Sequence, residues 1–227
     1  METARSGVQR AAALSQRLPT STVGILQSTL LPSLTVHSSL SLIAYTIGRV
    51  TRRVEAKDWL WPSGLVVNAW YHAVLSPAWE HNLPLRRVLD DLSWTQKLLL
   101  GGVTAWGARL FFRIANRSIK RGKDDPRYQS MNQDKSFWNK ALFTTFLPEA
   151  VFQSIIALSW SIPLKTVVTG AVAPPAEYVN LLHGLAIGLY TAGLGMEVLA
   201  DSQLESHKEQ SDDLNRSGVW SIVRHPK

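Results

Sequence analysis

Long runs without charged residues set the pattern of this chain. Residues 18–48, 59–79 and 178–196 contain no Asp, Glu, Lys or Arg, and each run is long enough to cross a bilayer as a helix. Two further apolar segments, 98–115 and 141–163, carry only Arg109, Arg113 and Glu149 as charged residues. We therefore predict an all-α, polytopic transmembrane bundle of about five spans, near residues 22–48, 59–79, 97–116, 141–163 and 178–200.

Polar stretches surround these spans: an N-terminal tail (1–21), residues 113–140, and a last segment (201–227) that we predict to be cytosolic and cofactor-binding. They lower the mean hydropathy to −0.02, a value that taken alone would favour a soluble helical domain. With five alternating spans, sixteen Lys and Arg fall on one side and seven on the other. Because the positive excess marks the cytosol, we expect the N-terminus to face away from it and Lys227 to lie in it.

Composition narrows the chemistry. The chain has 24 Lys and Arg, 17 Asp and Glu, and no cysteine, which excludes disulfides, thiolate metal sites and a cysteine nucleophile. Its six histidines lack metal-ligand spacing, and no phosphate-binding loop follows a strand, so we predict no metal site and no soluble dinucleotide-binding domain. The basic run 117–127 adjoins a span and belongs to no recognisable nucleic-acid-binding module. The expected partner is the lipid bilayer, and nucleic acid is not.

The cellular membrane is less sharply indicated. Three arginines and one acid in the first 17 residues are typical of a mitochondrial presequence, but they also fit a short tail before the first span. We expect an endoplasmic reticulum or other endomembrane location, with a mitochondrial membrane as the lesser alternative.

Two charged stripes and one small-residue stripe recur at helical spacing. Arg109, Arg113 and Arg117 form a basic stripe leaving the third span, and Glu197, Asp201 and Glu205 an acidic one at the end of the fifth. A purely structural interpretation is that the arginines contact lipid headgroups and that the acidic residues form ion pairs with those arginines. Pairing and a binding role are compatible, and we expect the two stripes to face each other in a pocket that can hold a nucleotide's phosphates and ribose hydroxyls. Gly184, Gly188 and Ala192 predict a face for close helix packing.

A series of short motifs, in this order, resembles an uncharacterised membrane family grouped with the steroid 5-alpha-reductases. The motifs are Trp106-Gly-Ala-Arg109-Leu110, Arg117, Gly122-Lys-Asp-Asp125-Pro-Arg127-Tyr128, Gly195-Met-Glu197-Val-Leu-Ala-Asp201-Ser-Gln203 and Gly218-Val-Trp220-Ser-Ile-Val-Arg224-His225-Pro226. The resemblance covers roughly residues 100 to 227. It implies a helical membrane bundle that holds NADPH on its cytosolic side and reduces an activated carbon–carbon double bond of a hydrophobic, sterol-like lipid.

The resemblance also implies which residues contact the cofactor, although it assigns no catalytic acid. The expected cofactor-binding residues are Arg109, Arg117, Asp125, Arg127, Tyr128, Glu197, Asp201, Gln203, Arg224 and His225. Lys227 stands where the family usually has Asn, and the chain ends before a segment that normally follows. We therefore expect a C-terminally truncated form that binds NADPH weakly and turns over no enone.

Two other functions remain open at this stage. A non-catalytic membrane scaffold would keep the bundle without binding NADPH. A relative of the isoprenylcysteine methyltransferases, which share a similar Arg-His-Pro segment, would bind a methyl donor instead. The oligomeric state is not indicated by the sequence.

Overall fold

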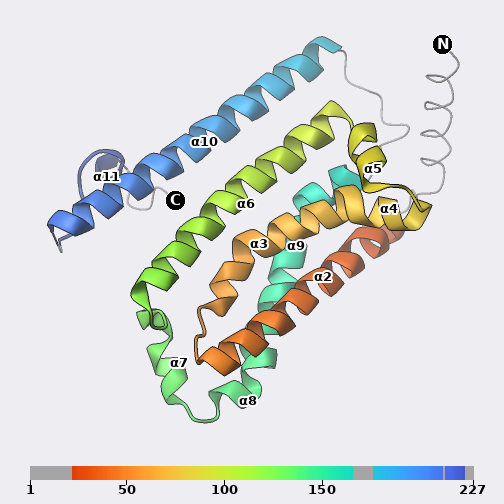
Figure 1. Ribbon diagram of the computed structural model, residues 1–227. Coiled ribbons are helices and arrows are strands. Elements are labelled where there is room, and N and C mark those ends of the chain that lie inside the picture. The colour runs from red at the N-terminus through yellow and green to blue at the C-terminus, as the bar shows by residue number, and fades with distance from the viewer. Residues whose placement is uncertain (1–21, 166–175, 212, 223–227) are drawn as a thin grey trace, which may run out of the picture. The chain divides into compact units, whose positions relative to one another are not determined.

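The computed structural model describes residues 22–165, 176–211 and 213–222, and every regular element in these ranges is helical (Figure 1). Internal contacts divide the chain into two units, Met1–Ala171 and Val172–Lys227. We call them unit 1 and unit 2 and describe each by itself.

Unit 1 is built around four long helical segments. The first is α2 (Thr22–Thr51); α3 (Ala56–Trp70) continues through the π-turn η1 (Tyr71–Leu75) into α4 (Ser76–His81). After α5 (Leu85–Asp91) come α6 (Trp94–Arg121), η2 (Pro126–Tyr128), α7 (Gln129–Gln133) and α8 (Phe137–Ala141), and then η3 (Leu142–Phe146) leads into α9 (Leu147–Lys165). Helix α3 packs against α2, α6 and α9, and α2 packs against α9.

Local sequence signals explain where α6 begins and ends. Ser93 accepts a hydrogen bond from the backbone N–H of Gln96, while the Gln96 side chain accepts one from the Ser93 backbone, which forms a capping box. At the other end Gly122 adopts a φ of 67°, a left-handed conformation that glycine reaches without a Cβ penalty. The chain therefore turns sharply there, which brings the polar segment after α6 back toward the start of α3.

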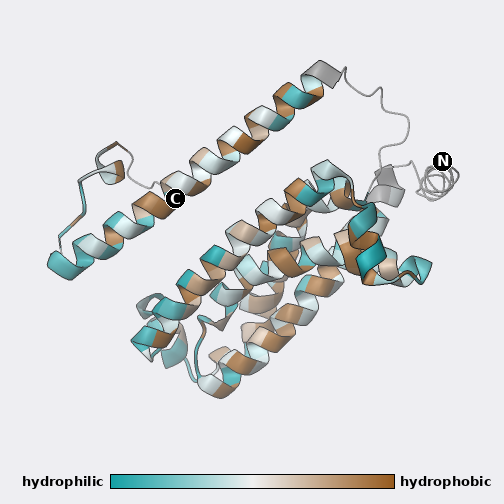
Figure 2. Ribbon diagram, turned by 45° about the horizontal axis from the view of Figure 1, so that its top comes forward, coloured by the Kyte–Doolittle hydropathy of each residue, from teal (hydrophilic) through white to brown (hydrophobic). Residues whose placement is uncertain are grey.

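Unit 1 buries polar side chains and exposes apolar ones. Its buried residues include Thr29, Ser33, His37, Ser41, Asn68, His72, Gln153, Ser154 and Ser161, whereas large apolar side chains such as Leu31, Ile43, Phe112, Phe143 and Phe152 are more than half exposed. Figure 2 shows hydrophobic residues distributed along the whole length of the long helices. This arrangement suits a bilayer, where the apolar surface meets lipid and polar groups must find partners inside.

Four helical segments are long and apolar enough to cross a membrane: Leu26–Thr51, Trp94–Arg121, Phe137–Lys165 and Tyr178–Gln210. They correspond to four of the five expected spans, so the all-α, polytopic helical architecture is confirmed. The remaining expected span, 59–79, is helical but is not among these four. It carries Asn68, His72 and Ser76, which are buried inside unit 1 rather than directed at lipid.

Unit 2 consists of one long helix and a short return. Helix α10 (Ala176–Gln210) is followed by a turn and by α11 (Val219–Ile222), which packs back on it. Along residues 178–199 of α10 most side chains are exposed, including Leu185 and Leu189. Within unit 2, Gly184 and Gly188 have no atoms within 4 Å of where a Cβ would stand, and the predicted role of this face in close helix packing stays a prediction.

Candidate functional site

A network of charged side chains joins the connections at one end of unit 1, where α2, α3, α6 and α7 meet (Figure 1). We call it the charged clasp. Its members are Arg53, Glu55, Asp58, Ser118, Arg121, Asp124, Asp125, Arg127, Tyr128 and Asn132.

Glu55 lies at the centre of the charged clasp and is only 4% exposed. Its carboxylate pairs with Arg53, and it accepts hydrogen bonds from the Ser118 hydroxyl at 2.5 Å and from Arg121 at 3.0 Å. Arg53 also donates to the Ser118 carbonyl at 2.9 Å, on the last turns of α6. A buried carboxylate is tolerated because two guanidinium groups and a hydroxyl compensate it.

Asp124 fixes the start of α3 from the loop after α6. Its two carboxylate oxygens accept hydrogen bonds from the backbone N–H groups of Val54 and Glu55, each at 3.0 Å. Asn132 of α7 donates to the same carboxylate at 2.5 Å. Backbone N–H groups at a helix start have no partner within the helix, and Asp124 accepts hydrogen bonds from them. Its negative charge also interacts favourably with the positive end of the α3 helix dipole.

Asp125, Arg127 and Tyr128, three expected cofactor-binding residues, contact one another through the charged clasp. Asp125 pairs with Arg121 at 2.9 Å and with Arg127 at 3.0 Å. Asp58 of α3 accepts from Arg127 at 2.9 Å and from the Tyr128 hydroxyl at 2.7 Å. The polar groups of these three residues thus serve to hold the loop on α3.

The pKa values of these groups follow from the same contacts. Burial alone would raise the pKa of the Asp125 carboxyl, but hydrogen bonds from Arg127 and the charges of Arg127 and Arg121 outweigh it and lower the pKa to about 2. The hydrogen bond to Asp125 raises the pKa of Arg127. Burial, followed by the hydrogen bond to Asp58, raises the pKa of the Tyr128 phenol. At neutral pH the charged clasp therefore contains ionised Asp125 and Arg127 and a protonated Tyr128.

A group of cations beside the charged clasp is exposed. Arg117, Lys120 and Lys123 lie on the last turns of α6 and just after it, and no described residue accepts a hydrogen bond from, or forms an ion pair with, their side chains. Arg109 lies deeper on α6 and is half-buried. The part of the predicted basic stripe that is best placed to meet an external anion is therefore its outer end at Arg117.

In unit 2 the expected residues behave differently from one another. Asp201 is 2% exposed, and Glu197 is half-buried. Gln203 accepts a hydrogen bond from the Val219 backbone at 2.9 Å, and its side chain lies where a Cβ of Gly218 would stand, at 2.5 Å. Trp220 donates through its indole N–H to the Ala200 carbonyl at 3.0 Å. Gln203, Gly218 and Trp220 thus hold the return on α10.

Two further expectations about the cofactor site are not tested by the contacts within either unit. Arg224 and His225 lie beyond the described residues. The expected meeting of the basic stripe of α6 with the acidic stripe of α10 joins the two separate units, and it stays a prediction. Within the described residues no group of three or more His, Asp or Glu side chains could hold a metal ion.

The sequence interpretation missed a second polar assembly, deep in unit 1. We call it the polar seam; its members are Ser33, His37, Asn68, His72, Gln153 and Ser161, from α2, α3, η1 and α9. Each is no more than 1% exposed. The Ser33 hydroxyl and His72 Nε2 are 2.8 Å apart, and the Ser161 hydroxyl donates to Asn68 Oδ1 at 2.8 Å.

A spacing signal for the polar seam is present in the sequence. Polar residues recur every fourth position at Thr29, Ser33, His37 and Ser41, and again at Asn68, His72 and Ser76. Such a stripe lies on one helix face and, inside an uncharged span, points to a buried polar contact rather than to lipid. Gly64 continues the second stripe, since a Cβ there would lie 2.9 Å from Gln153 Oε1 and 3.3 Å from His37 Nδ1.

Comparison with known proteins gives one finding about family. The family model DUF1295, described as a protein of unknown function, matches residues 44–227. No curated protein and no solved structure matches the chain. The matched range includes the charged clasp, most of the polar seam and all of unit 2.

Proposed function

The chain belongs to the DUF1295 family, and from that premise we propose that it is an integral membrane reductase. In this proposal NADPH binds at the basic end of unit 1, and the substrate is the conjugated double bond of an enone- or sterol-like lipid. The reaction itself comes from the resemblance of its ordered motifs to the steroid 5-alpha-reductases.

The observation that carries the proposal is the exposed cationic group of Arg117, Lys120 and Lys123 beside the charged clasp. Within the charged clasp the acidic and basic side chains form ion pairs with one another, so these three cations are not part of the ion pairs that stabilise the fold. Guanidinium and ammonium groups bind phosphate oxygens through charge-assisted hydrogen bonds. They fit the phosphate-bearing half of NADPH at the boundary between membrane and water.

Several other residues that were expected to contact the cofactor are already bonded to protein groups. Asp125, Arg127 and Tyr128 already make hydrogen bonds inside unit 1, so in this proposal they shape the site without contacting the cofactor. When bound, NADPH supplies a hydride to the substrate. The chain contributes cations that hold the phosphates and an apolar bundle that keeps water from the reacting groups.

Titration of the purified protein in lipid nanodiscs tests this proposal. We expect weak but saturable NADPH binding that Arg117→Glu weakens further by about tenfold to a hundredfold, because one charge-assisted hydrogen bond contributes about 1.5–3 kcal/mol and tenfold corresponds to about 1.4 kcal/mol. The control is Arg86→Glu, which reverses an exposed charge on α5, away from the charged clasp. Equal NADPH binding by the unaltered chain and Arg117→Glu would contradict the assignment.

A non-catalytic scaffold is the second candidate, and one observation favours it. The charged clasp uses Asp125, Arg127 and Tyr128 in contacts that hold the loop after α6 on α3. A scaffold predicts no saturable binding of NADPH in the titration above. Saturable binding of S-adenosylmethionine in place of NADPH would instead identify a methyltransferase.

A further inference from the structure

We propose that α2 binds an anionic phospholipid, with the headgroup phosphate at Arg49 and Arg52 and one acyl chain along α2 in a groove between α2 and α3. This binding uses none of the cations assigned to NADPH and is independent of the proposed function. Two exposed arginines, an exposed apolar strip of α2 and the groove carry the proposal.

The first arginine is held in position by an aromatic neighbour. Arg49 is exposed, donates through Nη1 to the Tyr45 hydroxyl at 2.6 Å, and places its guanidinium 5.9 Å from the Tyr45 ring centroid. Tyr45 in turn donates to the Trp138 carbonyl oxygen at 2.8 Å. The other N–H groups of Arg49 have no acceptor among the described residues. The guanidinium is therefore oriented before a ligand binds, with donors left for phosphate oxygens.

The second arginine stands where the backbone does not favour a side chain. Arg52 follows α2 and has a φ of 58°, in the left-handed region that glycine reaches without a Cβ penalty. Its side chain is exposed and forms no hydrogen bond or ion pair with the part of the chain that the structure describes. This arginine is thus kept at a conformational cost, and its charge is not used to hold the fold.

The acidic residues that follow these arginines in the sequence do not neutralise them. Glu55 and Asp58 are already paired within the charged clasp. The positive excess at this end predicts the cytosolic side of the membrane, and anionic lipids give the cytosolic leaflet its negative surface potential. The phosphate of such a lipid is therefore the anion that Arg49 and Arg52 are placed to meet.

An exposed apolar strip leads away from the arginines along α2. Ile43, Ile47 and Val50 are 55%, 45% and 78% exposed. Their spacing of four and three residues places them on one helix face, and Val36 lies two turns earlier on the same face. A soluble anion has no group to cover this strip, whereas an acyl chain has. The combination of strip and arginines therefore fits a lipid better than a free phosphate.

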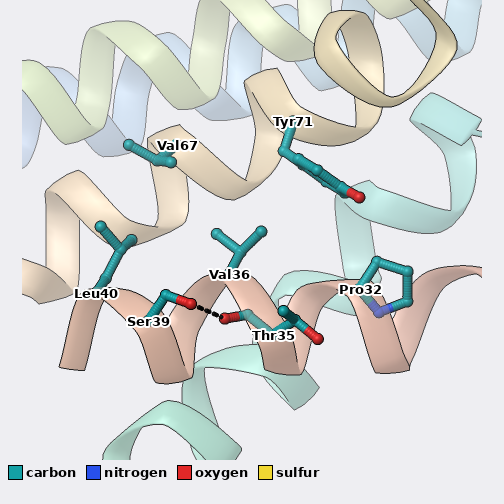
Figure 3. A pocket seen from close by; sticks show the side chains of 7 residues that line it. All are labelled: Pro32, Thr35, Val36, Ser39, Leu40, Val67 and Tyr71. Atoms are coloured by element: carbon teal, nitrogen blue, oxygen red, sulfur yellow. Dashed lines mark hydrogen bonds between the residues drawn. The ribbon is translucent and has the colours of Figure 1, made fainter. Parts of the chain in front are cut away.

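The strip runs into an apolar groove. The groove lies between α2 and α3 and has a volume of about 270 Å³ (Figure 3). On its α3 side Val67 is 42% exposed, so the groove opens to the surroundings of unit 1. Figure 3 shows the Val36 and Tyr71 side chains in the space between the two helices. The lining residues are Pro32, Thr35, Val36, Ser39, Leu40, Val67 and Tyr71.

The separation of groove and arginines fits one lipid leaflet. Leu40, at the near end of the groove, precedes Arg49 by nine residues, which corresponds to about 14 Å along a helix. Half of a hydrocarbon core of about 30 Å is about 15 Å. An acyl chain whose headgroup lies at Arg49 therefore reaches the groove near the middle of the bilayer. One lipid molecule thus contacts both features.

Binding of three probes to the purified protein in neutral detergent micelles, followed by native mass spectrometry, tests the proposal. The probes are dioleoyl phosphatidylserine, dioleoyl phosphatidylcholine and glycerophosphoserine, which has the anionic headgroup without chains. We expect saturable binding of phosphatidylserine, at least tenfold weaker binding of phosphatidylcholine, and no competition by glycerophosphoserine. Equal binding of the two lipids would overturn the proposal, as would full competition by glycerophosphoserine.

Arg52→Gly separates a headgroup contact from a structural role. Phosphatidylserine binding should weaken about fivefold, because one basic residue near an anionic surface contributes about 1 kcal/mol and tenfold corresponds to about 1.4 kcal/mol. Without lipid the unfolding temperature should stay equal or rise, because glycine suits the φ of this position. The control is Arg86→Gln, which removes an exposed charge on α5 and should leave lipid binding unchanged. Unchanged phosphatidylserine affinity in Arg52→Gly would contradict the headgroup contact.

Ser39→Phe tests the groove. Ser39 is exposed, and its hydroxyl donates to the Thr35 carbonyl oxygen of its own helix at 2.8 Å, so a larger side chain there fills the groove without breaking a contact between helices. We expect phosphatidylserine binding to fall at least fivefold. Ser159→Phe, at an exposed serine of α9 that bonds its own helix in the same way, is the control. Unchanged affinity in Ser39→Phe would overturn the acyl-chain assignment. If a variant does not fold, the three-probe comparison on the unaltered protein decides.

Discussion

Glu55 shows how a single residue holds a whole end of this molecule. Its carboxylate joins the connection before α3, through Arg53, to the end of α6, through Ser118 and Arg121. Neutralising it would leave two partly buried guanidinium groups without their anion, and a charge without its partner is costly in such a site.

We expect Glu55→Gln to lower the stability of unit 1 by about 1.5–3 kcal/mol, the usual contribution of a hydrogen bond to a charged group. Thermal unfolding in detergent measures this. The matched control is Asp91→Asn, which removes the carboxylate of an exposed ion pair 4.0 Å from Arg87. An exposed pair contributes little, so the control should unfold like the unaltered chain. Equal unfolding temperatures for both variants would contradict the central place of Glu55.

Asp125 gives the charged clasp a defined pH dependence. Its pKa in the folded protein, about 2, lies below its ordinary value of 3.8, so the unfolded chain takes up a proton first as the pH falls. The stability that Asp125 contributes is therefore fully present above about pH 4 and is lost as the pH falls toward 2.

Acid unfolding of the unaltered chain and of Asp125→Asn measures this difference. The variant lacks the titrating group, so it should be less stable at pH 6 and should lose less stability between pH 4 and pH 2. Parallel pH profiles for the two proteins would show that Asp125 does not titrate as its contacts require.

At the scale of elements, the close approach of α3 and α6 depends on Gly107. A Cβ at this position would stand 2.3 Å from Val66 Cγ2 and 3.0 Å from the Pro62 carbonyl oxygen. The Gly107 of the Trp-Gly-Ala-Arg motif is thus a packing residue that sets the helix separation.

Gly107→Ala should destabilise the bundle. Overpacking costs about 1–3 kcal/mol, which exceeds the gain of about 0.5–1 kcal/mol that alanine brings to a helix interior. Gly101→Ala on the same helix is the control. Nothing lies within 4 Å of the Gly101 Cβ position, so this variant should be stabilised by the higher helix propensity of alanine. Thermal unfolding of both variants decides, and a stabilised Gly107→Ala would show that the helices are not in tight contact there.

Sequence patterns predicted some elements well and others poorly, for physical reasons. The uncharged runs located α2 and α10, because a bilayer demands some twenty apolar residues and little else. The segment 59–79 was predicted to be a span like the others, yet it is not among the four helices that are apolar enough to cross a membrane, and its Asn68 and His72 are buried. Apolar run length does not report which helix face meets lipid; only the four-residue spacing does.

The same limit applies to the candidate site. A motif order identified the loop around Asp125 and Arg127, but motif order does not say whether a charge meets a ligand or another side chain. In the structure Asp125, Arg127 and Tyr128 contact one another and Asp58, and their cofactor contacts stay a prediction. Arg117 could be singled out from its spacing on α6, and its exposure agrees with a role outside the fold.

For the whole molecule, the distribution of charge implies an orientation. The basic connections after α2 and after α6 lie at one end of unit 1, where the charged clasp joins them. Exposed Leu and Ile on the flanks and polar groups within then require a bilayer around the bundle. From the positive excess at this end we predict that the charged clasp and its cations lie in the cytosol.

Cysteine labelling in sealed microsomes tests this placement most directly, because the chain contains no cysteine of its own. Ser130→Cys lies on α7 beside the charged clasp, and Leu85→Cys lies on α5; both positions are exposed. A membrane-impermeant maleimide should label Ser130→Cys in intact microsomes and Leu85→Cys only after permeabilisation. Labelling of Leu85→Cys in intact vesicles, with Ser130→Cys protected, would contradict the cytosolic placement of the charged clasp.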